Sequence, residues 1–202
     1  MNPLTTVKGA VVTAFVLAIV VSLVLTNVAG VPAGAHAAAT IWLHVVSGVM
    51  WIGLLYYFNV VQIPGLAAAA ADKGGPGGAG ISKYIAPTAL LWFRWAAVAT
   101  WVTGAAYLAA TGAFVDAFTL GASTGNPYHT VIGLGAWLGT IMLFNVWVLI
   151  WPNQKKVRSL VAATDEEKAA ARKTAMLASR TNFVLSVPML MCMIGAHHWM
   201  PL

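Results

Sequence analysis

Five long apolar stretches constrain this chain more than any other feature of its sequence. They are residues 7–29, 37–63, 87–110, 127–151 and 181–199. Each is long enough for a helix to cross about 30 Å of hydrocarbon, and none shows the alternation of a barrel strand. Only 8% of the 202 residues are charged, against about 25% in a soluble domain. We therefore predict an all-α integral membrane protein, a bundle of five transmembrane helices forming one domain over residues 1–202.

Local signals set the expected ends of these helices. Pro64-Gly65 should end the second helix, Pro87 should lie in the first turn of the third, and Trp151-Pro152 should end the fourth. The first stretch resembles a signal peptide, but its apolar core is longer than usual, and we expect it to be retained as a helix. In the fourth helix, Gly135 and Gly139 form a small-residue motif that favours close helix packing.

The positive charges predict how the helices are oriented. The connection over residues 153–180 is rich in basic side chains and should hold a helix that begins with a capping box at Thr164 and Glu167. Its basic residues are Lys155, Lys156, Arg158, Lys168, Arg172, Lys173 and Arg180. The positive-inside rule makes this loop cytoplasmic, with the N-terminus also cytoplasmic and the C-terminus periplasmic. We expect a multi-pass protein of the bacterial inner membrane.

One stripe of the second helix differs from an ordinary lipid-facing surface. Residues about 100° apart around the helix share this stripe. They are His44, Gly48, Trp51, Leu55, Asn59 and Gln62. A histidine and two amides are costly against lipid, so the stripe should face other helices.

The predicted topology also gathers the histidines near the outer membrane surface. His44, His129, His197 and His198 come from three helices, whereas His36 is expected to be only interfacial. Imidazoles from separate helices at one depth are how a bundle holds a b-type haem or a metal ion. We expect haem b to be bound by these four residues. The alternatives are a copper ion on His44, His129 and His198, or no cofactor.

A second polar group is expected toward the inner surface. Arg94, Asn59 and Asn145 would form a pocket for an anionic substrate, a quinone head or a haem propionate. The alternative is that Arg94 extends to the lipid headgroups and the amides only tie helices together. The single cysteine, Cys192, excludes an internal disulfide and a CxxCH haem attachment.

Several segments resemble the membrane domain of the urate hydroxylase family, the urate oxidase N-terminal domain. They are Trp42–Gly53, Trp92–Trp95, Trp137–Trp147 and Trp151–Lys156. In that family a multi-span membrane domain is followed by a cytochrome c domain, and the implied reaction is oxidation of urate to 5-hydroxyisourate. The resemblance is to short stand-alone forms without the cytochrome c domain, so electrons would need a separate acceptor.

Two main hypotheses for function remain open. The first is a membrane redox protein that holds haem b or a metal ion and exchanges electrons with a partner such as a cytochrome c. The second is a non-catalytic accessory subunit of a larger membrane complex. Oxidation of urate or a similar ring is a third, and association of this chain with itself is open in each.

Overall fold

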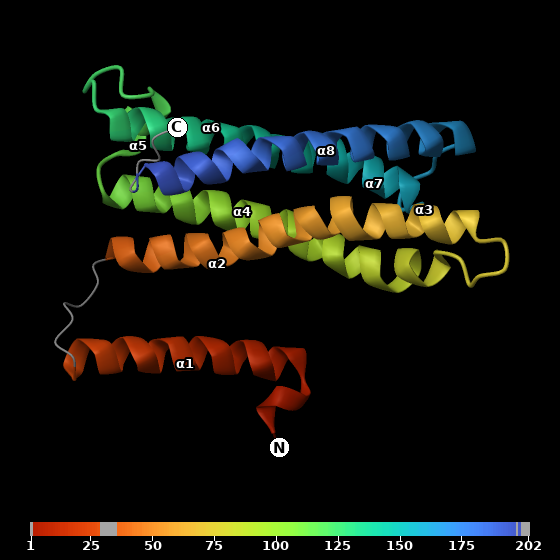
Figure 1. Cartoon of the computed structure of the whole chain (residues 1–202), viewed down its shortest axis with the longest axis horizontal. Helices are drawn as coiled ribbons and strands as arrows, with labels where there is room; N and C mark the ends of the chain where they lie inside the picture. The colour runs from red at the N-terminus through yellow and green to blue at the C-terminus, as the bar shows by residue number, and fades with distance from the viewer. Residues whose placement is uncertain (1, 29–35, 197, 199–202) are drawn as a thin grey trace. The chain divides into compact units, whose positions relative to one another are not determined.

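The computed structural model describes residues 2–28, 36–196 and 198, and within these residues it is helical and contains no strand (Figure 1). Five stretches of helix are long and apolar enough to cross a membrane. They are Val7–Asn27, Ala37–Ala71, Ile81–Ala110, Pro127–Val157 and Asp165–Gly195. The prediction of an all-helical protein with five candidate spans is confirmed. The orientation of the spans stays a prediction.

The chain divides into two units, Met1–His36 and Ala37–Leu202. The first unit contains a short 3-10 turn, Pro3–Thr5, and helix α1 (Val7–Asn27). The side-chain oxygen of Thr6 accepts a hydrogen bond from the backbone N–H of Gly9 and so caps the start of α1. Position 9 favours glycine, because a Cβ atom there would overlap the carbonyl oxygen of Pro3.

The second unit holds the other four spans, and three of them contain a π-helical segment. The helices are α2 (His36–Tyr56), α3 (Ile63–Ala71), α4 (Ala86–Ala110), α5 (Phe114–Phe118), α6 (Pro127–Phe144), α7 (Trp151–Val157) and α8 (Asp165–Gly195). The π-helical segments are η2 (Tyr57–Gln62), η3 (Ile81–Ile85) and η4 (Asn145–Ile150). η2 joins α2 to α3 in one span, and η4 joins α6 to α7 in another. η3 begins the span that continues as α4.

Each π-helical segment is followed directly by a helix with proline in its first turn. These prolines are Pro64, Pro87 and Pro152. A proline ring clashes with the carbonyl four residues earlier and has no N–H to donate, and a wider preceding turn relieves both problems. The prediction that Pro64 and Pro152 end their helices was therefore wrong. The chain continues as α3 and α7.

Helix α8 is a single helix of 31 residues. It begins with the predicted capping box, in which the hydroxyl of Thr164 and the carboxylate of Glu167 each accept a backbone N–H. The structure joins the polar loop helix and the fifth span into this one element, which ends at Gly195. Pro188 lies inside it and removes one backbone hydrogen bond.

The core of the second unit lies where α8 packs against α6 and the η4–α7 segment (Figure 1). Two buried amides join these elements, because the Nδ2 of Asn145 donates to the Oδ1 of Asn182 at 2.8 Å. The Nδ2 of Asn182 in turn donates to the carbonyl of Met142 at 2.9 Å. Gly135 allows close approach of α8, since a Cβ atom there would lie 3.1 Å from the Cβ of Cys192. Such hydrogen bonds and small residues hold helices together where lipid gives no hydrophobic drive.

Candidate functional site

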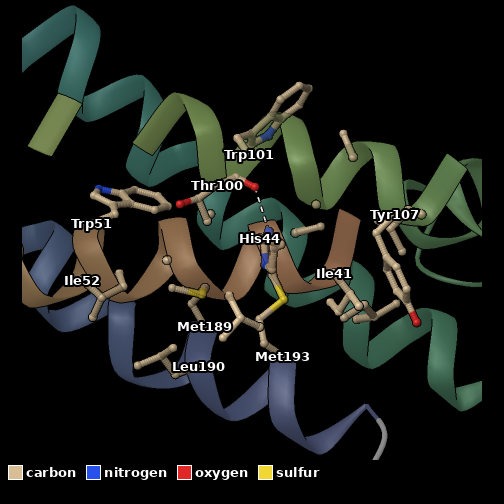
Figure 2. Close-up of a pocket in the computed structure, with 18 of the residues that line it drawn as sticks. Ile41, His44, Trp51, Ile52, Thr100, Trp101, Tyr107, Met189, Leu190 and Met193 are labelled. Carbon is tan, nitrogen blue, oxygen red and sulfur yellow. Dashed lines mark hydrogen bonds between the residues drawn. The ribbon is translucent and has the colours of Figure 1, made fainter. Parts of the chain in front are cut away.

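A cavity of about 490 Å³ lies among α2, α4, α6 and α8 (Figure 2). Its wall is almost entirely apolar, and α2, α4 and α8 contribute most of it. Among its lining residues are Ile41, Val49, Ile52, Ala105, Leu108, Ile132, Leu190 and Ile194. Its volume lies within the range of about 300–1,000 Å³ that is usual for sites of small ligands and cofactors. The cavity is therefore the leading candidate for a binding site in the second unit.

His44 is an ionisable residue of this cavity that a hydrogen bond holds in place. Its Nδ1 donates a hydrogen bond of 2.7 Å to the backbone carbonyl of Thr100 in α4, which also accepts one from the hydroxyl of Thr103 (Figure 2). A carbonyl oxygen only accepts, so Nδ1 carries the proton and Nε2 of the neutral ring keeps its lone pair. Gly104 makes room for the ring, because a Cβ atom there would lie 2.7 Å from two of its atoms.

The predicted inward stripe of the second helix is confirmed over its first four members. His44, Gly48 and Trp51 line the cavity, and Leu55 is completely buried. The indole of Trp51 is also buried, and its Nε1 has no hydrogen-bond partner among the described residues. Among the described residues, the cavity wall thus contains an imidazole and an unpaired indole N–H in mostly apolar surroundings.

Two methionines of α8 face the same cavity. Met189 and Met193 lie one turn apart and both line the cavity, and the sulfur of Met193 packs against Gly135 of α6, 3.5 Å from the position that a Cβ atom would take there. Thioether sulfur is a soft ligand for haem iron and for copper, although methionine also serves simply as packing. Methionines at helical spacing favour packing, and the fold places these two in the wall of the cavity that His44 also lines.

The other predicted histidines do not line this cavity. The Nδ1 of His129 lies 2.9 Å from the hydroxyl of Thr124 and 3.9 Å from a carboxylate oxygen of Asp116. His198 is exposed, and His197 lies outside the described residues. Within residues 2–28, 36–196 and 198, no three His, Cys, Asp or Glu side chains come together in a group able to hold a metal ion.

The predicted inner pocket is a separate region of the bundle. The guanidinium of Arg94 lies 3.8 Å above the ring of Trp151, and its Nη1 is buried without a hydrogen-bond partner among the described residues. The Nδ2 of Asn59 donates to the hydroxyl of Ser179 at 2.9 Å, whereas Asn145 is occupied by its pairing with α8. None of the three predicted residues lines the His44 cavity.

Sequence reasoning missed Thr100 and Gly104. Both lie on α4, one turn apart, and both touch the imidazole of His44. The available signal was a small residue four positions after a threonine in an apolar helix. That spacing is common, and nothing in the sequence pairs it with position 44.

These features define an all-helical protein with the spans of a multi-pass membrane protein. Residues 123–201 match the model of the family described as urate oxidase N-terminal, so the resemblance expected from the sequence is confirmed over this part of the chain. The match covers α6, η4, α7 and α8 with the cavity methionines, and it begins after His44 and Arg94. No curated protein and no solved structure matches the chain.

Proposed function

We propose that the protein is a membrane redox subunit that binds haem b in the apolar cavity, with Nε2 of His44 as a ligand of the iron. One observation carries this proposal. The hydrogen bond from Nδ1 to the carbonyl of Thr100 leaves the lone pair of Nε2 in a cavity of about 490 Å³. Histidines that bind metals commonly donate their other ring N–H to a carbonyl or a carboxylate in this way.

The residues of the cavity have distinct functions in this proposal. Thr100 fixes the tautomer and the orientation of the imidazole, and Gly104 allows the ring to lie flat against α4. The mostly apolar wall offers water few hydrogen-bond partners. Bound haem would supply reversible one-electron chemistry, and a methionine as second ligand would raise its reduction potential. Met193 and Met189 are the candidates for that ligand.

The partner would be a cytochrome c or another subunit of a membrane complex. The proposal places the protein in the inner membrane of a bacterium with its basic loop in the cytoplasm, because Lys and Arg are retained on that side. The cavity then lies toward the periplasmic half, since it is formed by the ends of α2, α4 and α8 that are farthest from the basic loop. Electrons would be exchanged on the periplasmic side.

The proposal is tested by an absorption spectrum and metal analysis of the protein purified from membranes. We expect a Soret band that shifts on reduction with dithionite and about one iron per chain. His44→Ala should lose the band. His129→Ala should retain it, because that imidazole is held at Thr124 and Asp116, away from the cavity. Far-UV circular dichroism of both variants controls for folding.

Other results would point to the alternatives. One copper per chain without a Soret band would mean that the cofactor is copper rather than haem, bound by His44 and a methionine sulfur. A colourless, metal-free preparation would instead support an accessory subunit without a cofactor. Equal haem content in His44→Ala and the parent protein would refute the assignment of His44.

Oxidation of urate is the second candidate activity, and the family match over residues 123–201 favours it. It is measured as consumption of urate by membranes that contain the protein, with cytochrome c added as the electron acceptor. Turnover that is lost in His44→Ala would assign the chemistry to the cavity. If a haem-containing preparation does not oxidise urate, the proposed function is electron transfer from a donor other than urate.

A further inference from the structure

A cationic cluster lies where α4 meets the η4–α7 segment, outside the His44 cavity. Two aromatic contacts define this junction. The rings of Trp95 and Trp147 pack edge to face at 5.3 Å, and the guanidinium of Arg94 lies over Trp151 at 3.8 Å. The junction therefore places a cation of one span against an aromatic wall of another.

Further positive charges approach the same junction. The Nζ of Lys155 lies 5.9 Å from the centre of the Trp151 ring, and Arg158 is close enough to Arg94 for their charges to repel. The ion pairs formed among the described residues are those of His129 with Asp116 and of Lys168 with Asp165, and neither reaches the cluster. Like charges gathered without a counter-ion raise the free energy of the folded chain unless an anion joins them.

Two donors at this junction also have no hydrogen-bond acceptor among the described residues. Nη1 of Arg94 and Nε1 of Trp147 are both buried and unpaired. A buried donor without an acceptor destabilises the folded chain, and more so when it is charged. Each donor needs an acceptor, and the positive charges of Lys155 and Arg158 near Arg94 favour an anionic one.

We propose that this junction binds the oxyanion of an anionic phospholipid headgroup through Arg94 and Trp147. The surroundings favour a lipid over a soluble phosphate or carboxylate. Trp92 and Trp95 are each 55% exposed beside the site, and Phe144 and Val148 are exposed on the adjoining span. An apolar, aromatic surface next to a phosphate-binding arginine accommodates acyl chains, and tryptophan is typical of the membrane interface.

The test compares two lipids with identical acyl chains, phosphatidylglycerol and phosphatidylcholine, added to the purified protein in detergent. Bound lipid is counted by native mass spectrometry over a titration. We expect phosphatidylglycerol to bind more tightly by at least about tenfold, the effect of one charge-assisted hydrogen bond. Arg94→Gln should abolish the preference, and Trp147→Phe should weaken it while keeping the aromatic ring.

Arg172→Gln is the matched control, because it removes the same charge from an exposed position of α8. It should leave the preference unchanged. Should Arg94→Gln fail to fold, Trp147→Phe and Arg94→Lys decide the question, since both preserve the bulk of the site. Equal binding of the two lipids, or equal loss in Arg94→Gln and Arg172→Gln, would overturn the proposal. So would displacement of phosphatidylglycerol by millimolar inorganic phosphate, which would make a soluble anion the ligand.

Discussion

Replacement of Gly104 by alanine tests the geometry of the His44 site directly. The new Cβ atom would lie 2.7 Å from Cε1 and Nδ1 of the imidazole, whereas contacts below 3.0 Å essentially never occur. The ring must therefore retreat by about 0.7 Å to reach an ordinary contact of 3.4 Å. Its hydrogen bond to the carbonyl of Thr100 is 2.7 Å long, and this movement takes it out of the usual range.

The size of the effect follows from three terms. Alanine is favoured over glycine inside a helix by about 0.5–1 kcal/mol. The lost hydrogen bond costs about 0.6–1.7 kcal/mol in a membrane protein, and a side chain forced off its rotamer costs about 0.5–1.5 kcal/mol. Gly53→Ala is the matched control, because it lies inside α2 and its Cβ atom would meet nothing within 4 Å. We expect Gly104→Ala to be less stable than Gly53→Ala by about 1–3 kcal/mol.

The assay is equilibrium unfolding in detergent, followed by far-UV circular dichroism and by the fluorescence of the nine tryptophans. A second pair of measurements, made in a His44→Ala background, tests whether the imidazole causes the loss of stability. In a His44→Ala background the clash is gone, so Gly104→Ala should become stabilising by about 0.5–1 kcal/mol. The reasoning fails if Gly104→Ala is as stable as Gly53→Ala in the parent protein, or if removal of the imidazole does not rescue it.

Three further substitutions test the packing of the second unit. Asn182→Ala should lower the free energy of unfolding by about 1–3 kcal/mol, because it leaves the buried amide of Asn145 without an acceptor, and the same unfolding titration measures it. Thr164→Ala should cost about 1 kcal/mol through loss of the cap of α8, with a parallel fall in helicity. Gly133→Ala should displace α5, because its Cβ would overlap the carbonyl oxygen of Ala117, and faster proteolysis near residues 114–125 would report this. Unchanged protease sensitivity would contradict the last of these predictions.

The helices were predictable because length and apolar character alone require them in a membrane. The inward stripe of α2 was equally predictable, since a histidine and two amides at helical spacing are costly against lipid. The ends of the helices were harder to predict from the sequence. Pro64 and Pro152 were predicted to end their helices. The π-helical turns before them depend on hydrogen bonds that no local sequence rule specifies.

The candidate site was predicted only in part for a related reason. His44 was identified from its own helix, but its partner is a backbone carbonyl, and every residue of the chain has one. His129 belonged to the same predicted cluster by depth, yet the loop after α5 supplies Thr124 as a nearer partner. Depth in the membrane can be estimated from a sequence. Rotation of each helix about its axis depends on packing, and that sets which side chains meet.

The proline inside α8 divides that helix into two parts that are held in different ways. Before it, Asn182 and Ser186 attach the helix to its neighbours, at 2.8 Å from Asn145 and 3.1 Å from the hydroxyl of Tyr56. After it, Met189 and Met193 form one side of the cavity. A helix bends at least cost where proline has removed a hydrogen bond. The last two turns are therefore held less by their own backbone than by packing against α6, where Gly135 lets Cys192 approach closely.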